Sequence, residues 1–221
     1  GGPFDLFAFI PFRLLLHGLP GTGKTHCARC LSGEIQKPLI TVSYSQILSK
    51  WVSECEKELT NAFEQAKAQD AILFLDEVDS ILTQRTTSSR SWENSSVNTL
   101  LMLLDKRDTN VILASNFPEI LDSALRRRVE ETIEFLPPKA PARKEIWKKE
   151  LERHGLGITG LDLDELSTIP LSGGLIFNAV RKAHMRKTVM GKGFEQNTEA
   201  FKSLALEESL KMEKNFACPK K

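Results

Sequence analysis

The sequence lacks the features that would place it in several large protein classes. No apolar run approaches the length of a membrane span, and no secretory signal is recognisable. Thirty lysines and arginines oppose 29 acidic residues, so the net charge of +1 gives no electrostatic argument for nucleic-acid binding. The hydrophobic content of 41% and the charged content of 27% are ordinary for a soluble globular protein. We therefore expect a cytoplasmic protein with no membrane span and no nucleic-acid partner.

Cysteine is also scarce, with four in the chain. Cys27 and Cys30 have the C-x-x-C spacing of a metal site, but no second pair follows at zinc-site spacing, and Cys55 and Cys218 are isolated. A reducing compartment fits this pattern. We expect Cys27 and Cys30 to bind no metal and to pack a helix against a sheet.

What the sequence does contain is a complete phosphate-binding loop at residues 18–25, Gly-Leu-Pro-Gly-Thr-Gly-Lys-Thr. The glycines let the backbone curl so that several N–H groups face phosphate oxygens. Lys24 adds a positive charge for the β- and γ-phosphates, and the Thr25 hydroxyl is placed to ligate Mg²⁺. An apolar segment precedes the loop and a breaker-free segment follows it, which makes a chance match in a glycine-rich turn the weaker alternative. The residues predicted to contact the nucleotide here are Pro20, Gly21, Thr22, Gly23, Lys24 and Thr25.

A pair of acidic residues follows the apolar run at residues 71–75. Two adjacent carboxylates at the end of a buried strand are costly unless a cation or a reaction uses them. We expect Asp76 to hold Mg²⁺ and Glu77 to orient and polarise the water that attacks the γ-phosphate. A solvated acidic turn is the competing interpretation, and the phosphate-binding loop argues against it.

Apolar segments alternate with helical ones in the first two thirds of the chain. The predicted strands are residues 12–17, 38–44, 71–75, 110–115 and 132–136, with helices over 54–68 and 91–105 between them. After a proline-rich segment at 136–141 only helical patterns follow, at 142–154, 162–168, 173–190 and 198–213. The sequence thus predicts an α/β fold, a parallel five-stranded P-loop sheet flanked by helices, followed by a small all-helical lid domain. We place the domains at 1–139 and 140–221, and since the chain begins without Met we expect further sequence upstream.

Three further segments reduce the number of nucleotide-hydrolase families that the sequence could resemble. They are the strand 111–116 that ends in an amide, the arginine-rich segment 121–128, and Ser-Lys-Trp-Val at 49–52. Together with the loop and the acidic pair, they resemble the AAA family of ATPases within the AAA+ group. The resemblance covers residues 12 to about 185, and it is nearest to the meiotic clade with katanin, spastin and the endosomal-sorting ATPases. Residues 90–93 with 97–98 also look like prokaryotic AAA ATPases.

The resemblance implies roles for residues that the motifs alone do not explain. Asn116 matches the sensor position beside the acidic pair, although a strand-end turn also favours Asn. Arg127 and Arg128 match the arginine fingers that reach the nucleotide of a neighbouring subunit. A solvated basic run is the alternative interpretation for these arginines.

Two more segments are assigned by the same resemblance. Lys50, Trp51 and Val52 match the central-pore loop that grips a translocating polypeptide, and a tryptophan buried in the core is the alternative. Gly173, within Ser-Gly-Gly at 172–174, matches the lid segment that closes over the nucleotide, while a helix N-cap preceded by a turn is compatible with the same residues.

The chain also departs from the family pattern. Leu19 replaces the usual proline of the loop, and Ser53 replaces the usual glycine after the pore aromatic. Val129 and Glu131 replace the common residues after the arginines, and Arg181 lies late on its helix, so no second sensor arginine is evident.

We expect an Mg²⁺-dependent ATPase that works as a homo-oligomer, a hexameric ring, and remodels, disassembles or unfolds a polypeptide substrate. A relative of the clamp loaders or helicase loaders, acting on nucleic-acid complexes, is the second hypothesis. A scaffold that binds nucleotide with weak turnover is the third. The intact set of Lys24, Asp76, Glu77 and Asn116 argues against the scaffold.

Overall fold

The computed structural model describes residues 10–43, 52–79, 93–117, 123–190 and 195–216. Within the helices, the side chains of residues 52–53, 93–95, 190 and 211–216 are not described. Contacts divide the chain into two compact units. The first is the sheet unit, which extends to Phe135, and the second is the helical unit, which begins at Leu136 and includes the loop segment Pro20–Gly23. The domain boundary expected at residue 139 stays a prediction.

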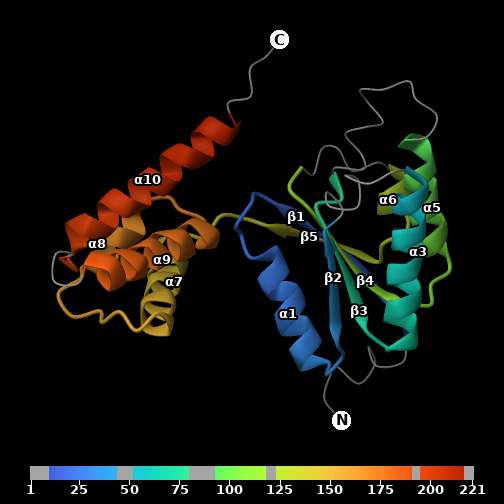
Figure 1. Ribbon diagram of the computed structural model, residues 1–221, viewed down its shortest axis with the longest axis horizontal. Helices are drawn as coiled ribbons and strands as arrows, with labels where there is room; N and C mark the ends of the chain where they lie inside the picture. Colours follow the sequence, from blue (N-terminus) through green and yellow to red (C-terminus); the bar gives the residue numbers. More distant parts are fainter. Residues whose placement is uncertain (1–9, 44–51, 80–92, 118–122, 191–194, 217–221) are drawn as a thin grey trace. The chain divides into compact units, whose positions relative to one another are not determined.

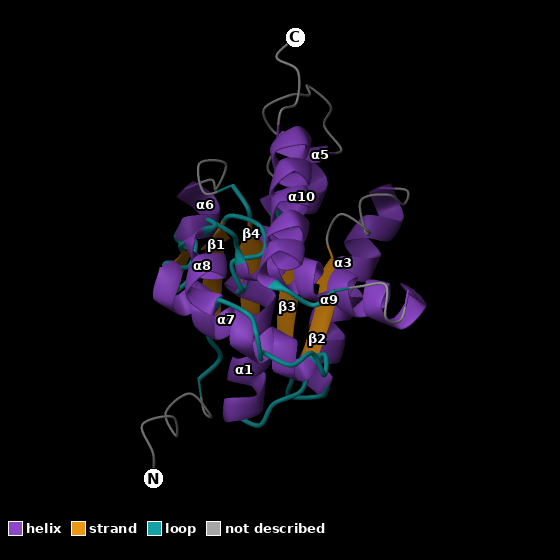
Figure 2. Cartoon of the chain, turned by 90° about the vertical axis from the view of Figure 1, so that its left-hand side faces the viewer, coloured by secondary structure: helices purple, strands orange, loops and turns teal. Residues whose placement is uncertain are grey.

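The sheet unit contains a five-stranded sheet in the order β2-β3-β4-β1-β5, with every neighbouring pair parallel. Figure 2 shows β2, β3, β4 and β1 side by side in orange. The predicted fold class is confirmed. The strands are β1 (Arg13–Gly18), β2 (Leu39–Ser43), β3 (Ile72–Asp76), β4 (Asn110–Ser115) and β5 (Glu131–Phe135).

Helices cover both faces of this sheet, with α1 on one side and α3 and α5 on the other (Figure 1). Successive residues of a strand point to opposite faces, so Leu73 and Leu75 pack with α3 and α5 while Ile72 and Phe74 pack on the α1 side. Burial on both faces explains why β3 and β4 are continuous apolar runs. The helices are α1 (Lys24–Glu34), α3 (Val52–Ala68), α5 (Glu93–Asp105) and the short α6 (Ser123–Arg126).

The expectation for the cysteines is wrong in one respect. Cys27 is half-buried and packs against the core on the α1 side, but Cys30 is exposed and its Sγ lies 3.5 Å from His26 Nε2. Ala28 is the fully buried residue of α1, and a residue two positions later lies on the opposite side of a helix. Residues three positions apart lie on the same side of a helix, but the buried face of α1 is centred on Ala28, so Cys27 reaches the core and Cys30 does not.

The helical unit packs four helices around an aromatic and aliphatic core. The Trp147 ring meets the Phe201 ring edge to face, with centroids 5.9 Å apart, and both side chains are fully buried. Asp162 caps α8 by accepting a hydrogen bond from the Glu165 N–H at 2.9 Å. The helices are α7 (Ala140–Arg153), α8 (Leu163–Thr168), α9 (Gly173–Met190) and α10 (Thr198–Phe216). Across the described ranges, none of the helices combines the length and apolarity that a bilayer crossing requires.

Candidate active site

The parallel strands bring several polar residues to the same edge of the sheet. β1 runs into the phosphate-binding loop, β3 ends at Asp76, and β4 ends one residue before Asn116. Since all these strands run in the same direction, their carboxyl ends meet along one edge, which is where open α/β sheets bind their ligands. Lys24, Thr25, the acidic pair and Asn116 therefore lie along one edge of the sheet.

The loop begins at Gly18, a position that only glycine can occupy. Its φ is 139°, and a Cβ there would lie 2.2 Å from the Phe135 carbonyl oxygen on β5. The close approach of β1 and β5 therefore requires the first glycine of the motif. The loop glycines Gly21 and Gly23 also have positive φ angles of 74° and 109°.

Lys24 opens α1 and is only 6% exposed. Its Nζ donates hydrogen bonds to the carbonyl oxygens of Gly18, at 2.7 Å, and of Leu19, at 3.1 Å. Burial lowers the pKa of Lys24, and the nearby carboxylates of Asp76 and Asp79 oppose that shift. An ammonium that is buried beside loop carbonyls is poised to exchange part of this shell for phosphate oxygens.

The same loop contacts the start of α9 within the helical unit. The Gly174 N–H donates to the Gly21 oxygen at 2.9 Å, and a Cβ on Gly174 would lie 2.9 Å from the Gly21 Cα. Gly173 is the first residue of α9, and a Cβ there would lie 3.5 Å from the Gly21 oxygen. The Ser172 hydroxyl, which a Cβ on Gly21 would meet at 2.7 Å, is buried without a hydrogen-bond partner. An unpaired buried hydroxyl beside the loop fits a site that binds a polar ligand.

Asp76 connects β3 to the loop helix. The Thr25 hydroxyl donates to Asp76 Oδ2 at 3.4 Å, and the Glu77 N–H donates to Asp76 Oδ1 at 2.9 Å. Burial raises the pKa of Asp76, while the hydrogen bond from the Glu77 backbone opposes the rise. The structure thus places a hydroxyl and a carboxylate side by side, a donor set of hard oxygens that suits Mg²⁺.

Glu77 follows with a positive φ of 59°, an uncommon conformation for a residue with a Cβ. Its Oε2 accepts a hydrogen bond of 3.3 Å from the hydroxyl of Ser43, the last residue of β2. Ser43 is the register partner of Asp76 in the sheet, which is why it reaches the acidic pair. The sequence motifs do not indicate Ser43, although its position at the end of a predicted strand is a usable signal.

Asp79 is a second residue that the motifs do not indicate. It is 8% exposed, and its Oδ1 accepts a hydrogen bond of 3.1 Å from the Asn116 N–H. The Val78 N–H donates to the Ala114 oxygen at 3.0 Å, so the segment after β3 is bound to the end of β4 at two points. These bonds fix the backbone of Asn116 beside the acidic pair.

The two arginines lie in different environments. Arg127 is exposed, whereas the half-buried Arg128 forms an ion pair with Asp105 at the end of α5, with Nη2 and Oδ2 2.8 Å apart. Both arginines directly follow α6, and they lie about a hundred residues after the phosphate-binding loop in the sequence. Their action on a neighbouring nucleotide stays a prediction.

The pore-loop prediction falls outside the described residues. Lys50 and Trp51 are not described, and Val52 is the first residue of α3, with a side chain that is likewise not described. Substrate contact by these three residues therefore also stays a prediction.

Comparison with known proteins identifies the family of the chain. The model of the "ATPase family associated with various cellular activities (AAA)" matches residues 14–136, more than half of the chain. A cell division cycle protein 48 homolog of Archaeoglobus fulgidus is 37% identical over 166 residues, which are 72% of this chain and 22% of the relative. A putative 26S proteasome regulatory subunit homolog of Methanothermobacter thermautotrophicus is 33% identical over 218 residues, 95% of this chain and 57% of the relative.

A spastin homolog of Caenorhabditis elegans is 35% identical over 150 residues, 65% of this chain and 29% of that protein. The chain thus spans between about a fifth and somewhat over half the length of these curated relatives. The matched region contains the strands, the acidic pair and the arginine segment described above. With the family model, these matches confirm the resemblance drawn from the motifs: the chain belongs to the AAA family of ATPases.

Proposed function

We propose that the chain binds ATP with Mg²⁺ and hydrolyses it to ADP and phosphate at the carboxyl edge of the sheet. The observation that carries the proposal is the hydrogen bond between Thr25 and Asp76, which joins the loop helix to the acidic strand end. It brings the two expected Mg²⁺ ligands together beside the buried ammonium of Lys24.

Each residue of the site has a separate role in the proposed reaction. Lys24 and the loop N–H groups bind the phosphates, and Thr25 with Asp76 would hold Mg²⁺, which neutralises phosphate charge when bound. Glu77 accepts the proton of the water that attacks the γ-phosphate, and Ser43 holds the Glu77 carboxylate. Asn116, fixed through its backbone, positions that water. Gly173 closes over the nucleotide.

We further propose that the chain acts as a homo-oligomer, a hexameric ring in the cytoplasm, that remodels a polypeptide. In this proposal the arginine segment at residues 127–128 completes the nucleotide site of the neighbouring subunit, and Lys50, Trp51 and Val52 contact the polypeptide. Family membership and the exposure of Arg127 support it. Members of the family perform widely different tasks, so the proposal of a polypeptide substrate depends on the motif at residues 50–52.

ATP binding and turnover of Lys24→Ala test the nucleotide site. We expect this variant to lose ATP binding, because no other described side chain supplies a buried cation to the loop. The control is Glu134→Gln, an exposed carboxylate of β5 in the same unit, which should bind and hydrolyse ATP normally. Undiminished ATP affinity in Lys24→Ala would contradict the proposal.

Mixed assemblies test the ring. Arg127→Ala subunits keep their own loop and should recover hydrolysis when they are mixed with Lys24→Ala subunits, which supply intact arginines. Mixtures that co-assemble without any recovery would exclude action across the interface. Stimulation of turnover by an unfolded polypeptide supports the remodelling proposal, whereas stimulation by DNA would favour the loader hypothesis.

A further inference from the structure

Three contacts occupy the guanidinium of Arg128. Its Nε and Nη2 donate to the two carboxylate oxygens of Asp105, at 2.9 and 2.8 Å. Its Nη1 donates to the Ala124 carbonyl oxygen at 2.9 Å. Paired, parallel hydrogen bonds between a guanidinium and a carboxylate are the strongest and most directional form of ion pair. One side chain therefore binds the end of α5 to the turn of α6.

Arg127 differs from its neighbour in every one of these respects. Its side chain is exposed, and within the described ranges its guanidinium has neither a hydrogen bond nor an ion pair. Its backbone is nonetheless fixed, because the Arg127 N–H donates to the Ser123 oxygen at 3.2 Å and the Arg128 N–H to the Leu125 oxygen at 3.0 Å. The Arg128 side chain is thus bound to α5 and α6, while the Arg127 side chain is exposed at the surface.

The position of Asp105 is explained by this contact. It is the last residue of α5, where the helix dipole disfavours a carboxylate. The hydrogen bond from Arg128 leads the causes that hold the pKa of Asp105 below its ordinary value, ahead of the charges of Arg107 and Arg13. The neighbouring Arg13 is itself bound, since it pairs with Glu130 and its Nη1 donates to the Leu104 oxygen at 2.8 Å.

We propose that Arg128 is a positioning residue held by Asp105, and that Arg127 alone of the pair reaches the nucleotide of the neighbouring subunit. To reach outward, Arg128 would give up two charge-assisted hydrogen bonds and leave Asp105, at a helix end, without its hydrogen-bonded partner. Arg127 gives up nothing. The inference rests on the proposed action across the subunit interface and assigns it to one side chain.

ATP hydrolysis by four variants separates the two arginines. We expect Arg127→Ala to lose roughly a thousandfold in kcat, as a finger does. Asp105→Ala and Arg128→Ala should each lose about tenfold through misplacement of Arg127, with the KM for ATP unchanged. The double variant Asp105→Ala/Arg128→Ala should lose no more than either single variant, because both remove the same contact.

Conservative variants distinguish a positioning role from general destabilisation, because they restore the charge of the substituted residue. Asp105→Glu and Arg128→Lys each retain an opposite charge and should recover part of the loss, while Arg127→Lys should not recover, because Lys lacks the fork that matches phosphate oxygens. Asp108→Ala is the matched control. It breaks an ion pair of 2.6 Å with Lys67 in the same unit and should leave kcat unchanged.

Amide exchange of the chain tests the positioning independently of hydrolysis. The N–H groups of Arg127 and Arg128 should exchange about threefold faster in Asp105→Ala and in Arg128→Ala, but not in Asp108→Ala. Unchanged exchange would overturn the positioning role. A loss in Arg128→Ala as large as that in Arg127→Ala, with Asp105→Ala unaffected, would make Arg128 a finger as well. If Arg127→Ala hydrolyses ATP normally, the action across the interface fails, and the exchange result still decides whether Asp105 positions the turn.

Discussion

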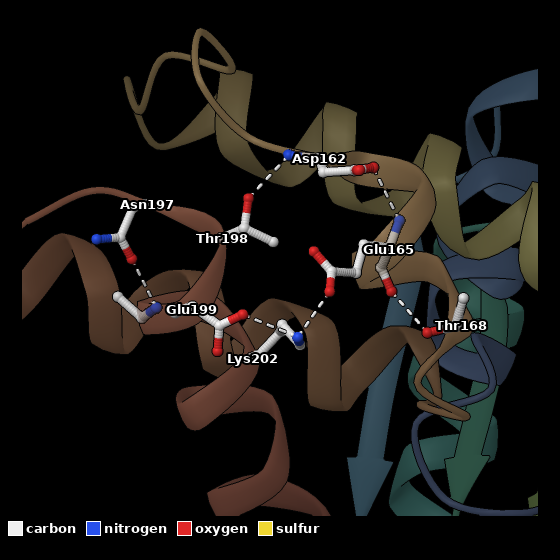
Figure 3. Close-up of polar contacts among 8 residues, drawn as sticks. Asp162, Glu165, Thr168, Asn197, Thr198, Glu199 and Lys202 are labelled. Atoms are coloured by element: carbon white, nitrogen blue, oxygen red, sulfur yellow. Dashed lines mark hydrogen bonds and ion pairs between the residues drawn. The ribbon is translucent and has the colours of Figure 1, made fainter.

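The candidate site in the sheet unit and the surface of the helical unit use charge in opposite ways. In the sheet unit, Lys24 and Asp76 are buried enough that desolvation shifts the pKa of each toward the neutral form. In the helical unit, Lys202 lies between Glu165 and Glu199 at the surface (Figure 3), and hydrogen bonds to these carboxylates raise its pKa to about 12. The first arrangement costs stability, whereas the second contributes to it.

This difference indicates where the chemistry lies. Buried charges without full compensation persist where a ligand uses them, and shifted pKa values of this kind cluster at functional sites. Surface pairs such as Lys144 with Asp164, at 2.6 Å, connect helices and need no ligand to explain them. We therefore expect substitutions at these surface pairs of the helical unit to act on stability, and those at the sheet edge to act on hydrolysis.

The largest expected effect on stability is that of Trp147→Ala. Removing this fully buried ring, together with its contact to Phe201, should cost roughly 3–5 kcal/mol and unfold the helical unit. The measurement is thermal or denaturant unfolding.

Trp51→Ala is the informative counterpart. If Trp51 contacts substrate, this substitution should leave the melting temperature nearly unchanged while remodelling of a polypeptide is lost. A large loss of stability in Trp51→Ala would place that residue in the core instead.

Ser43→Ala should have an intermediate effect, and on catalysis rather than on folding. Loss of its hydrogen bond to Glu77 should lower kcat about two- to tenfold with unchanged ATP affinity, the value of one positioning bond. Ser32→Ala is the control, since it removes a hydroxyl near the end of α1 that donates to the Lys37 oxygen. A rise in kcat would mean that Ser43 restrains Glu77 away from the attacking water.

Features of the fold and the site could be predicted from the sequence where the residues involved are close together along the chain. The loop motif and the acidic pair are local patterns, so Lys24, Asp76 and the alternating strands could be predicted from short segments. The contacts of Ser43 with Glu77 and of Asp79 with Asn116 join residues 34 and 37 positions apart, and they depend on strand register. Cys30 was misplaced because C-x-x-C spacing does not state which face of a helix is buried.

The smallest expected effect is that of Lys202→Met. Because its folded pKa is raised above the unfolded value, the stabilisation from Lys202 is fully present below a pH of roughly 10.4 and is lost as the pH rises through about 12. Near neutral pH we expect a small fall in the melting temperature, which salt should diminish. Lys148→Met, an exposed lysine of α7, should cause no such fall. Equal melting temperatures for the two variants would remove Lys202 from the contacts that stabilise this unit.

The proposed hydrolysis depends most directly on Glu77 as the residue that activates water. Single-turnover conversion of ATP to ADP, with the chain in excess over nucleotide and Mg²⁺ present, measures this step for the wild type and for Glu77→Gln. We predict that the wild type converts its bound ATP and that Glu77→Gln binds ATP with similar affinity but retains it unhydrolysed. Conversion at the wild-type rate by Glu77→Gln would contradict the assignment of Glu77 as the residue that activates water.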